Sequence, residues 1–363
     1  MNHPLRRHAI LSGLLSLAIA AGCNSSSPKR STVDGGSQPD GGGLDQSMTE
    51  DTGAVDQTLA DAADASETGE TIPHTATMFL PNSLSNTIYR YAITPNGDPQ
   101  ISGMLSADRA QGAVLAASGE LLVADYSGMD RLYRVTQPLG ALALGDSITG
   151  LGLHFPQEMR FVDDELWIVN SADHACTSEA QSIVRVAFDA DGKASVAGTV
   201  QMNLIGANRG MLWVPATRDL YVTQCTPVNT IQHFRVAADH SVTALPAITG
   251  MGLANPHGMV MTSWGELLVV NDDSKKILRF TVDTAGAATA TGTIEGNGLS
   301  APVGLALTEW GELFVVNQGD GSISRFTFAA DHSAVANGTF PTNTPTIAGQ
   351  FGVGWIVLAP AAP

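Results

Sequence analysis

A repeat of 46 residues in the C-terminal half is the sequence feature that most constrains the fold. Glu266 and Glu312 occupy the same place in two consecutive copies, 46 residues apart. Each copy carries an x-Gly pair, a Gly-Glu-Leu run and an Ile-x-Arg-Phe segment, which are His257-Gly258, Gly265-Glu266-Leu267 and Ile277–Phe280 in one copy and Val303-Gly304, Gly311-Glu312-Leu313 and Ile323–Phe326 in the next. A fixed period of this size, built from apolar β-rich runs and turn residues, is typical of a propeller blade.

The Ile-x-Arg-Phe segment or a near variant occurs six times. The copies are Ile88–Tyr91, Leu132–Val135, Ile183–Val186, Ile231–Phe234, Ile277–Phe280 and Ile323–Phe326. An apolar run that ends in a polar residue precedes each copy, and a run apolar on both faces fits a strand packed between neighbouring sheets. The sequence therefore predicts an all-β fold, a six-bladed β-propeller over residues 75–363, with four strands in each blade.

The two ends of the propeller are expected to meet. Five innermost strands follow the x-Gly pairs, and a sixth candidate, Val353–Leu358, lies at the C-terminus. The first repeat, which starts at Thr77, lacks an innermost strand of its own. We expect the C-terminal strand to pair with this N-terminal blade, which closes the ring and removes an exposed sheet edge.

The N-terminus has the composition of an exported protein. Residues 1–22 carry two arginines and an apolar run too short to span a membrane, which predicts a signal peptide. Ala20–Cys23 resembles a bacterial lipobox, which implies cleavage before Cys23 and its lipidation; ordinary secretion is the alternative. Residues 23–74 then form an acidic Gly/Ser/Asp tether that is expected to be disordered. The expected location is the cell envelope, at the outer membrane or cell surface, since Asn24 gives no inner-membrane retention signal.

Residues 75–363 carry 25 acidic and 14 basic residues, an excess that argues against nucleic acid or an anionic membrane surface as a partner. The membrane would then be reached only through the lipid anchor. The sequence has no phosphate-binding Gly-rich loop, no nucleophile elbow and no Cys-x-x-Cys pair. We expect a monomer whose partner is a protein, a peptide or a saccharide.

The x-Gly, Gly-Glu-Leu and Ile-x-Arg-Phe elements resemble those of six-bladed propellers of the NHL-repeat and SMP-30/gluconolactonase-like kind, including streptogramin-lyase-like members. The resemblance implies that the innermost strands begin around a central funnel, which is the default binding site. The expected lining residues are Gln111, Gln157 or Glu158, Arg209, His257, Val303 and Val353. The residues expected just behind them, which close the second strands, are Asn82, Asp125, Asn170, Gln224, Asn271 and Asn317.

Two chemistries follow from this resemblance. Hydrolases of the SMP-30 kind hold a divalent metal, Ca²⁺ or Mg²⁺, by oxygen ligands, but Arg209, His257 and Val303 do not make an oxygen cage. Lyases of the streptogramin kind are implied to use a funnel histidine as a base near a metal, a position that His257 matches. Glu158 could then be a ligand and Arg209 could hold an anionic group. In the alternative, His257 only forms a hydrogen bond at the start of a strand.

The remaining polar residues have structural readings. The Asn and Asp side chains that close the second strands can bond local backbone, and the repeated arginine can form an ion pair or pack between blades, with His233 as an exception that could be a surface residue. Cys176 and Cys225 follow the second strands of adjacent blades, so a Cys176–Cys225 disulfide is expected in an oxidising compartment.

Two hypotheses for function result. The first is a non-catalytic, lipid-anchored binding module that uses the funnel face, because most funnel positions are not catalytic residue types. The alternative is a metal-assisted lyase or hydrolase centred on His257, with Glu158 and Arg209 assisting.

Overall fold

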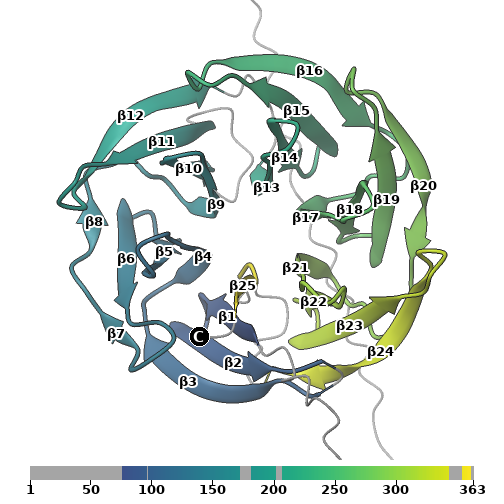
Figure 1. Ribbon diagram of the computed structural model, residues 1–363, viewed down its shortest axis with the longest axis horizontal. Helices are drawn as coiled ribbons and strands as arrows, with labels where there is room; N and C mark the ends of the chain where they lie inside the picture. The colour runs from purple at the N-terminus through teal and green to yellow at the C-terminus, as the bar shows by residue number, and fades with distance from the viewer. Residues whose placement is uncertain (1–75, 96, 172–180, 202–206, 343–353, 361–363) are drawn as a thin grey trace, which may run out of the picture. The chain divides into compact units, whose positions relative to one another are not determined.

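The computed structural model describes residues 76–95, 97–171, 181–201, 207–342 and 354–360. In this part of the chain all regular secondary structure is β-strand, and six sheets stand around one axis (Figure 1). The predicted all-β, six-bladed propeller is confirmed. Nowhere in these ranges does the chain form a helix with the length and apolarity of a membrane span. The predicted signal peptide, Cys23 and the tether lie outside the described residues and stay predictions.

Each blade is an antiparallel sheet whose strands follow one another from the axis outward. The first three blades comprise β25 (Val357–Pro360), β1 (Ala76–Asn82), β2 (Thr87–Ile93) and β3 (Gln100–Ser106); then β4 (Ala110–Leu115), β5 (Leu121–Asp125), β6 (Arg131–Thr136) and a divided outer edge of β7 (Ala143–Leu144) and β8 (Ile148–Thr149); then β9 (Pro156–Val162), β10 (Glu165–Asn170), β11 (Ser182–Phe188) and β12 (Ala194–Gln201).

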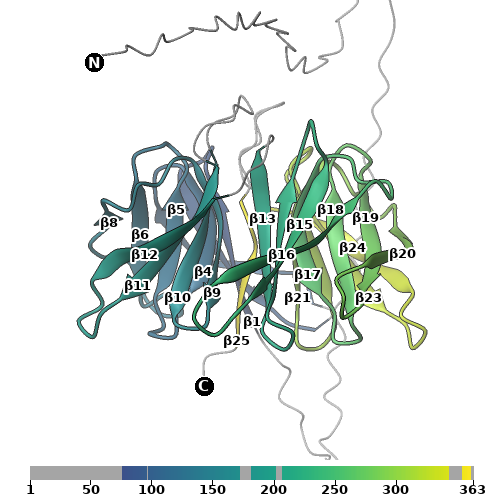
Figure 2. The ribbon, with the colours of Figure 1, turned by 90° about the horizontal axis from the view of Figure 1, so that it is seen from above.

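The other three blades follow the same pattern. They comprise β13 (Asn208–Val214), β14 (Asp219–Gln224), β15 (Thr230–Val236) and β16 (Val242–Thr249); then β17 (Pro256–Met261), β18 (Glu266–Asn271), β19 (Lys276–Val282) and β20 (Ala288–Ile294); then β21 (Pro302–Leu307), β22 (Leu313–Asn317), β23 (Ser322–Phe328) and β24 (Ala334–Pro341). Figure 2 shows the strands from the side, with the turns gathered on the two opposite faces of the propeller.

The ends of the chain close the ring as expected. Strand β25 pairs antiparallel with β1, from Ala76 opposite Pro360 to Phe79 opposite Val357. The regular strand begins at Val357, four residues later than predicted, although the Gly354 N–H already donates to the Pro81 carbonyl at 2.7 Å. The first blade is thus assembled from both ends of the chain, and β1 has no free edge.

The x-Gly glycines are explained by the crowding of the innermost strands around the axis. A Cβ on Gly258 would lie 2.9 Å from the Val303 carbonyl oxygen of the next blade, closer than real Cβ atoms come. At Gly112 the added atom would overlap the Gln157 carbonyl. At Gly112 and Gly258 glycine is therefore required, because the backbones of adjacent blades lie too close together there for a Cβ.

The Glu of Gly-Glu-Leu and the Arg of Ile-x-Arg-Phe are partners in one blade. Arg279 stands opposite Leu268, so it lies on the same face of the sheet as Glu266, and its Nε is 3.1 Å from the Glu266 carboxylate. Arg325 and Glu312 repeat the arrangement at 2.7 Å. The ion pair predicted for the repeated arginine is thus present, and it links the second and third strands of the blade.

His233 takes the place of the repeated arginine in the fourth blade. It is 1% exposed, its ring stacks on Tyr221 with centroids 4.3 Å apart, and its Nε2 lies 3.2 Å from Asp219. The surface role considered for His233 is therefore wrong, because an aromatic stack and a neighbouring carboxylate bury the ring as they would bury the arginine stem.

The same arginines also reach the next blade. Arg90 donates to the Gly140 carbonyl and Arg134 to the Gly192 carbonyl, each at 2.6 Å. Arg325 completes the circuit from the sixth blade to the first through Asp98, at 3.2 Å. Each of these contacts falls on a turn between the third and fourth strands, so the outer parts of adjacent blades are fastened by polar contacts.

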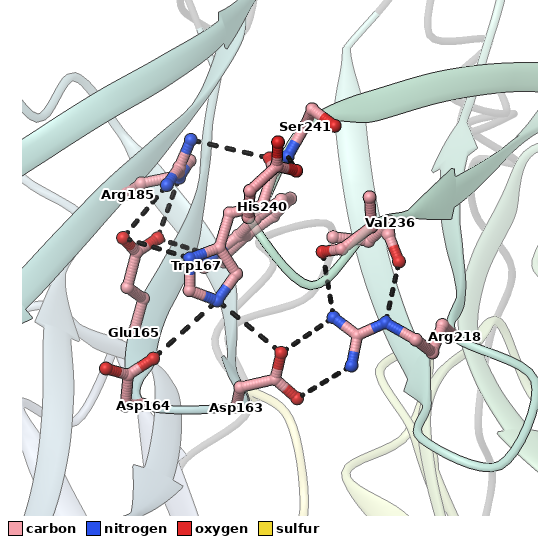
Figure 3. Close-up of polar contacts among 11 residues, drawn as sticks. Asp163, Asp164, Glu165, Trp167, Arg185, Arg218, Val236, His240 and Ser241 are labelled. Carbon is pink, nitrogen blue, oxygen red and sulfur yellow. Dashed lines mark hydrogen bonds and ion pairs between the residues drawn. The ribbon is translucent and has the colours of Figure 1, made fainter.

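The interface between the third and fourth blades has a dense polar network (Figure 3). Arg218 forms two hydrogen bonds with the Asp163 carboxylate, at 3.2 and 2.7 Å, and these hold the pKa of Asp163 below its usual value. His240 lies beside the same carboxylate and beside Glu165, with nitrogen–oxygen distances of 3.5 and 3.3 Å. Glu165 is in turn bound by Arg185.

The hydrophobic core is divided among the spaces between blades. In one cluster the buried Leu122 of β5 packs with Ile168 of β10, and in another Leu268 of β18 packs with Val315 of β22. This is why the second strands are apolar on both faces, as the sequence indicated.

Candidate functional site

Irregularities in the innermost strands present side chains to the axis. The pairing of β13 with β14 shifts register between Asn208 and Met211, and that of β17 with β18 shifts between Pro256 and Met259. Bulges of this kind re-aim a side chain and terminate regular pairing. They fall at Arg209 and His257, the two positions that the sequence singled out in these strands.

A partly enclosed cavity of about 60 Å³ lies where the innermost strands begin. It is lined by Gln111, Tyr126, Gln157, Arg209, Asn255, His257, Asp272, Val303, Gln318, Gly354 and Trp355. We call it the axial cavity. All six blades contribute to it, since the first blade supplies Gly354 and Trp355 just before β25.

Five predicted funnel residues do line the axial cavity: Gln111, Gln157, Arg209, His257 and Val303. A sixth, Val353, lies outside the described residues. The sequence is thus a good guide to the positions that stand directly before the repeated glycine, or before Glu158 in the third blade.

Of the two residues proposed for the third blade, Gln157 lines the cavity and Glu158 does not. Glu158 occupies the place of the glycine in the third blade, and its carboxylate turns between blades. There it pairs with Arg160 and accepts the Met211 N–H at 2.7 Å. Burial raises the pKa of Glu158, and Arg160 opposes that effect. Glu158 therefore links two blades rather than facing a ligand.

The Asp and Asn residues that close the second strands also turn away from the cavity. Asn271 accepts the Ala254 N–H at 2.7 Å, Asn317 accepts the Ser300 N–H at 3.0 Å, and Asn170 holds the backbone of His154. Asp125 binds Arg131 and the Ser127 N–H, and Asn82 accepts from Leu84 and Ser85. These contacts have the structural role that the sequence offered as the alternative.

The second ring of the cavity comes from the residues one position later. Tyr126, Asp272 and Gln318 directly follow Asp125, Asn271 and Asn317, and all three line the cavity. Because side chains alternate between the faces of a strand, an offset of one residue changes which way a side chain points. Asn255 and Trp355 were also missed, and for Trp355 the signal was its place two residues after the predicted start of the closing strand.

Three ionisable groups give the cavity its electrostatics. Burial lowers the pKa of His257 to about 3, and the nearby Arg209 cation is the smaller cause of the same shift, so the imidazole is neutral at neutral pH. Burial raises the pKa of Asp272 to about 6, with Asp273 adding to the effect and Arg209 opposing it. The site therefore combines a neutral imidazole, a permanent cation and a carboxyl group that holds its proton unusually well.

Five residues of the cavity carry a buried polar atom without a hydrogen-bond partner in the part of the chain that the structure describes. These atoms are Gln111 Oε1, Gln157 Nε2, Arg209 Nε, Gln318 Oε1 and Trp355 Nε1. A buried polar group without a partner costs about 1–3 kcal/mol. Their concentration around one cavity indicates a place for a polar ligand or water.

The residues do not fit the divalent metal that the resemblance to propeller hydrolases and lyases left possible. Ca²⁺ and Mg²⁺ need several anionic or carbonyl oxygens. Asp272 is the only carboxylate among the described lining residues, and the Arg209 guanidinium stands close enough to depress the pKa of His257. Within the described ranges no group of three His, Cys, Asp or Glu side chains could hold an ion. We therefore derive no step through a metal.

The predicted disulfide is not present at Cys225. This residue is buried as a free thiol, with Sγ 3.3 Å from the Ala207 carbonyl oxygen, and it contributes to the raised pKa of Arg209. Its expected partner, Cys176, lies outside the described residues.

The fold defines a class, the six-bladed β-propellers, and solved structures of propeller enzymes match the chain. A 6-phosphogluconolactonase-like protein of Bacteroides uniformis is 14% identical, with a TM-score of 0.57 over 74% of this chain and 83% of that one. The periplasmic gluconolactonase of Pseudomonas aeruginosa is 14% identical, with a TM-score of 0.56 over 74% and 84%. A streptogramin B lyase is 13% identical, with a TM-score of 0.49 over 80% and 95%.

At these identities the likeness to the two structures with TM-scores above 0.5 shows the fold alone. No family model and no curated protein matches the sequence. The function has therefore to be argued from the axial cavity.

Proposed function

We propose that this protein is an enzyme that acts on a small carbonyl compound by acid–base chemistry in the axial cavity, as a lactone or ester hydrolase or as a lyase, with His257 as the base. The observation that carries the proposal is the cavity's combination of His257 kept neutral, Arg209 kept charged and Asp272 with a raised pKa. Groups with pKa values pushed in opposite directions are the usual signature of acid and base roles.

In the hydrolytic form, His257 takes a proton from water while the water oxygen bonds to the carbonyl carbon. The negative charge that develops on the carbonyl oxygen is stabilised by Arg209. The carbon–oxygen bond to the leaving group then breaks, and Asp272 in its protonated form supplies the proton to the leaving oxygen. His257 afterwards returns its proton to Asp272, which restores the starting state.

The low pKa of His257 is compatible with this role. Burial is the larger cause of the low pKa, and the cation of Arg209 is the smaller one. As negative charge develops beside Arg209, that cause is neutralised, and the imidazole becomes a stronger base during the reaction. A lyase would use the same groups, with His257 removing a proton from carbon.

The non-catalytic binding module expected from the sequence is the competing reading. Val303 and Gly354 are inert lining residues, and they favour it. The named activities of the structural neighbours, gluconolactonase and 6-phosphogluconolactonase, agree better with the enzymatic alternative.

Acid release from a panel of lactones and esters, followed in a pH-stat, tests the proposal. His257→Asn is expected to lower kcat/KM by about 10²–10⁴-fold, as loss of a general base does. His154→Asn is the matched control, because His154 is exposed and does not line the cavity. We expect activity to survive a metal chelator. Full activity in His257→Asn, or ligand binding without turnover by the wild type, would support the binding module instead.

A further inference from the structure

The unpartnered atoms of the axial cavity differ in whether they can donate or accept a hydrogen bond. The amides of Gln111, Gln157 and Gln318 can present either end to a ligand, since oxygen and nitrogen exchange by a flip of the group. Arg209 Nε and Trp355 Nε1 are donors only. Whatever completes the site must therefore offer lone pairs to at least two N–H groups.

These donors belong to a built site rather than to a surface. Trp355 is 4% exposed and Gln157 is 1% exposed, so water from bulk solvent does not satisfy them freely. Trp355 is fixed beside His257, with ring centroids 6.2 Å apart. Two buried side chains with unpartnered N–H groups thus stand at the same cavity as the Arg209 guanidinium.

The charges around Arg209 restrict further which kind of ligand the axial cavity can bind. Burial lowers the pKa of Arg209, and the side chains of Cys225 and Tyr126, which hydrogen-bond with it, raise it. Asp272 is the one carboxylate on the described lining, and it is engaged by the Asn255 amide at 2.9 Å. Among the described residues Arg209 therefore has no dedicated anion, and a ligand can supply one.

Size sets the remaining limit. A cavity of about 60 Å³ corresponds to roughly two water molecules. A planar carboxylate group fits this space, and its two oxygens offer about four lone pairs to the donors.

We propose that the axial cavity binds the carboxylate group of a small organic acid, with Arg209, the Trp355 indole N–H and the Gln157 amide as donors. The inference deepens the proposed function and rests on it in naming the reactant: the compound carries a carboxylate or, as a hydrolysed lactone or ester does, releases one.

Titration of the full-length protein with acetate tests the site directly, without turnover. The indole N–H resonance of Trp355, assigned with Trp355→Phe, is followed by NMR at pH 6. We expect acetate to shift this resonance saturably and acetamide, the neutral analogue, to leave it unmoved. An equal response to both compounds, or to neither, would overturn the proposal.

Variants then separate the donors, with acetate affinity measured by isothermal titration calorimetry, because Trp355→Phe has no indole resonance at this position. Arg209→Met is expected to weaken acetate binding at least about tenfold, and Trp355→Phe by about three- to tenfold, as loss of a charge-assisted or a single hydrogen bond does. Trp264→Phe is the matched control, because the Trp264 indole already donates to Glu266 at 2.8 Å. Wild-type affinity in Trp355→Phe, which keeps an aromatic ring and needs no change of charge, would refute the assignment even if Arg209→Met failed to fold.

Two further arms complete the experiment. Inorganic phosphate is expected to bind more weakly than acetate, and preference for phosphate would overturn the choice of a carboxylate. Acetate binding without any lactone or ester turnover would leave the anion site standing and remove the proposed reaction, whereas turnover without acetate binding would do the reverse.

Discussion

The glycines around the axis give a graded prediction for stability. Replacing each by alanine adds a single Cβ whose clearance from the next blade differs from site to site. At Gly112 the new atom overlaps the Gln157 carbonyl, at Gly258 it lies 2.9 Å from the Val303 carbonyl, and at Gly304 it lies 3.3 Å from the Gly354 carbonyl.

The magnitudes follow from how far backbone must move. At Gly112 both atoms belong to strands of a closed ring, so the ring itself must widen, and we expect a loss of at least about 3 kcal/mol. Gly258→Ala needs a shift of a few tenths of an ångström and should cost about 1–3 kcal/mol. Gly304→Ala should cost about 1 kcal/mol or less. Gly198→Ala is the control, since its nearest contact is Arg185 Nη1 at 3.7 Å; we expect a change within about 0.5 kcal/mol.

Urea unfolding followed by tryptophan fluorescence measures the series. A loss of about 3 kcal/mol lowers the midpoint by roughly 1 M, which is well resolved. The order of midpoints should follow the order of clearances. Equal stability of Gly112→Ala and Gly198→Ala would refute the argument that the blades meet backbone to backbone.

Three other perturbations test separate parts of the structure. Because the pKa of Asp272 is raised from 3.8 to about 6, the folded state binds this proton more tightly, and stability falls as pH rises through that window. Asp272→Asn should therefore raise stability by about 1–3 kcal/mol at pH 8 and change little at pH 4. Asp273→Asn, which removes only the smaller cause of the raised pKa, should give a smaller rise at pH 8; thermal denaturation at the two pH values decides. Glu312→Gln leaves the buried Arg325 without its main partner and should cost about 3 kcal/mol in urea, and an unchanged midpoint would contradict the pairing. Deletion of Val357–Pro360 exposes the edge of β1 and should abolish the single cooperative transition in calorimetry, so a wild-type transition would argue against closure by β25.

The architecture could be predicted because the repeat carries it redundantly. Blade number follows from six copies of the Ile-x-Arg-Phe segment, and ring closure follows from one surplus innermost strand at the C-terminus. An ion pair at the repeated arginine could be anticipated because the arginine recurs, and in the last two blades its partner Glu recurs 13 residues before it, at Glu266 and Glu312. The role of Glu158 could not be anticipated, because it stands where other blades have glycine. A sequence alone does not show whether a side chain at this position turns to the axis or into the gap between blades.

Only part of the site could be predicted from the sequence, for a related reason. Residues before each glycine, such as Arg209 and His257, occupy a position that repeats with the blades, so comparison of the copies finds them. The second ring was assigned one residue too early, at Asn271 rather than Asp272, because the Asn recurs and the Asp does not. Recurrence marks what every blade needs for its own turn, whereas the cavity uses a different residue from each blade.

Trp355 lies in the same short segment that fastens the C-terminus of the chain to its first strand. A molecule bound by the indole would therefore stabilise the pairing between the two ends of the chain by the free energy of its binding. Ligand binding in the axial cavity and the pairing of β25 with β1 would then be coupled. Separation of the two strands would release the ligand, and a tightly bound ligand would keep the strands paired. A ligand bound at Trp355 would thus stabilise the pairing of β25 with β1, which is the point where the ring can open.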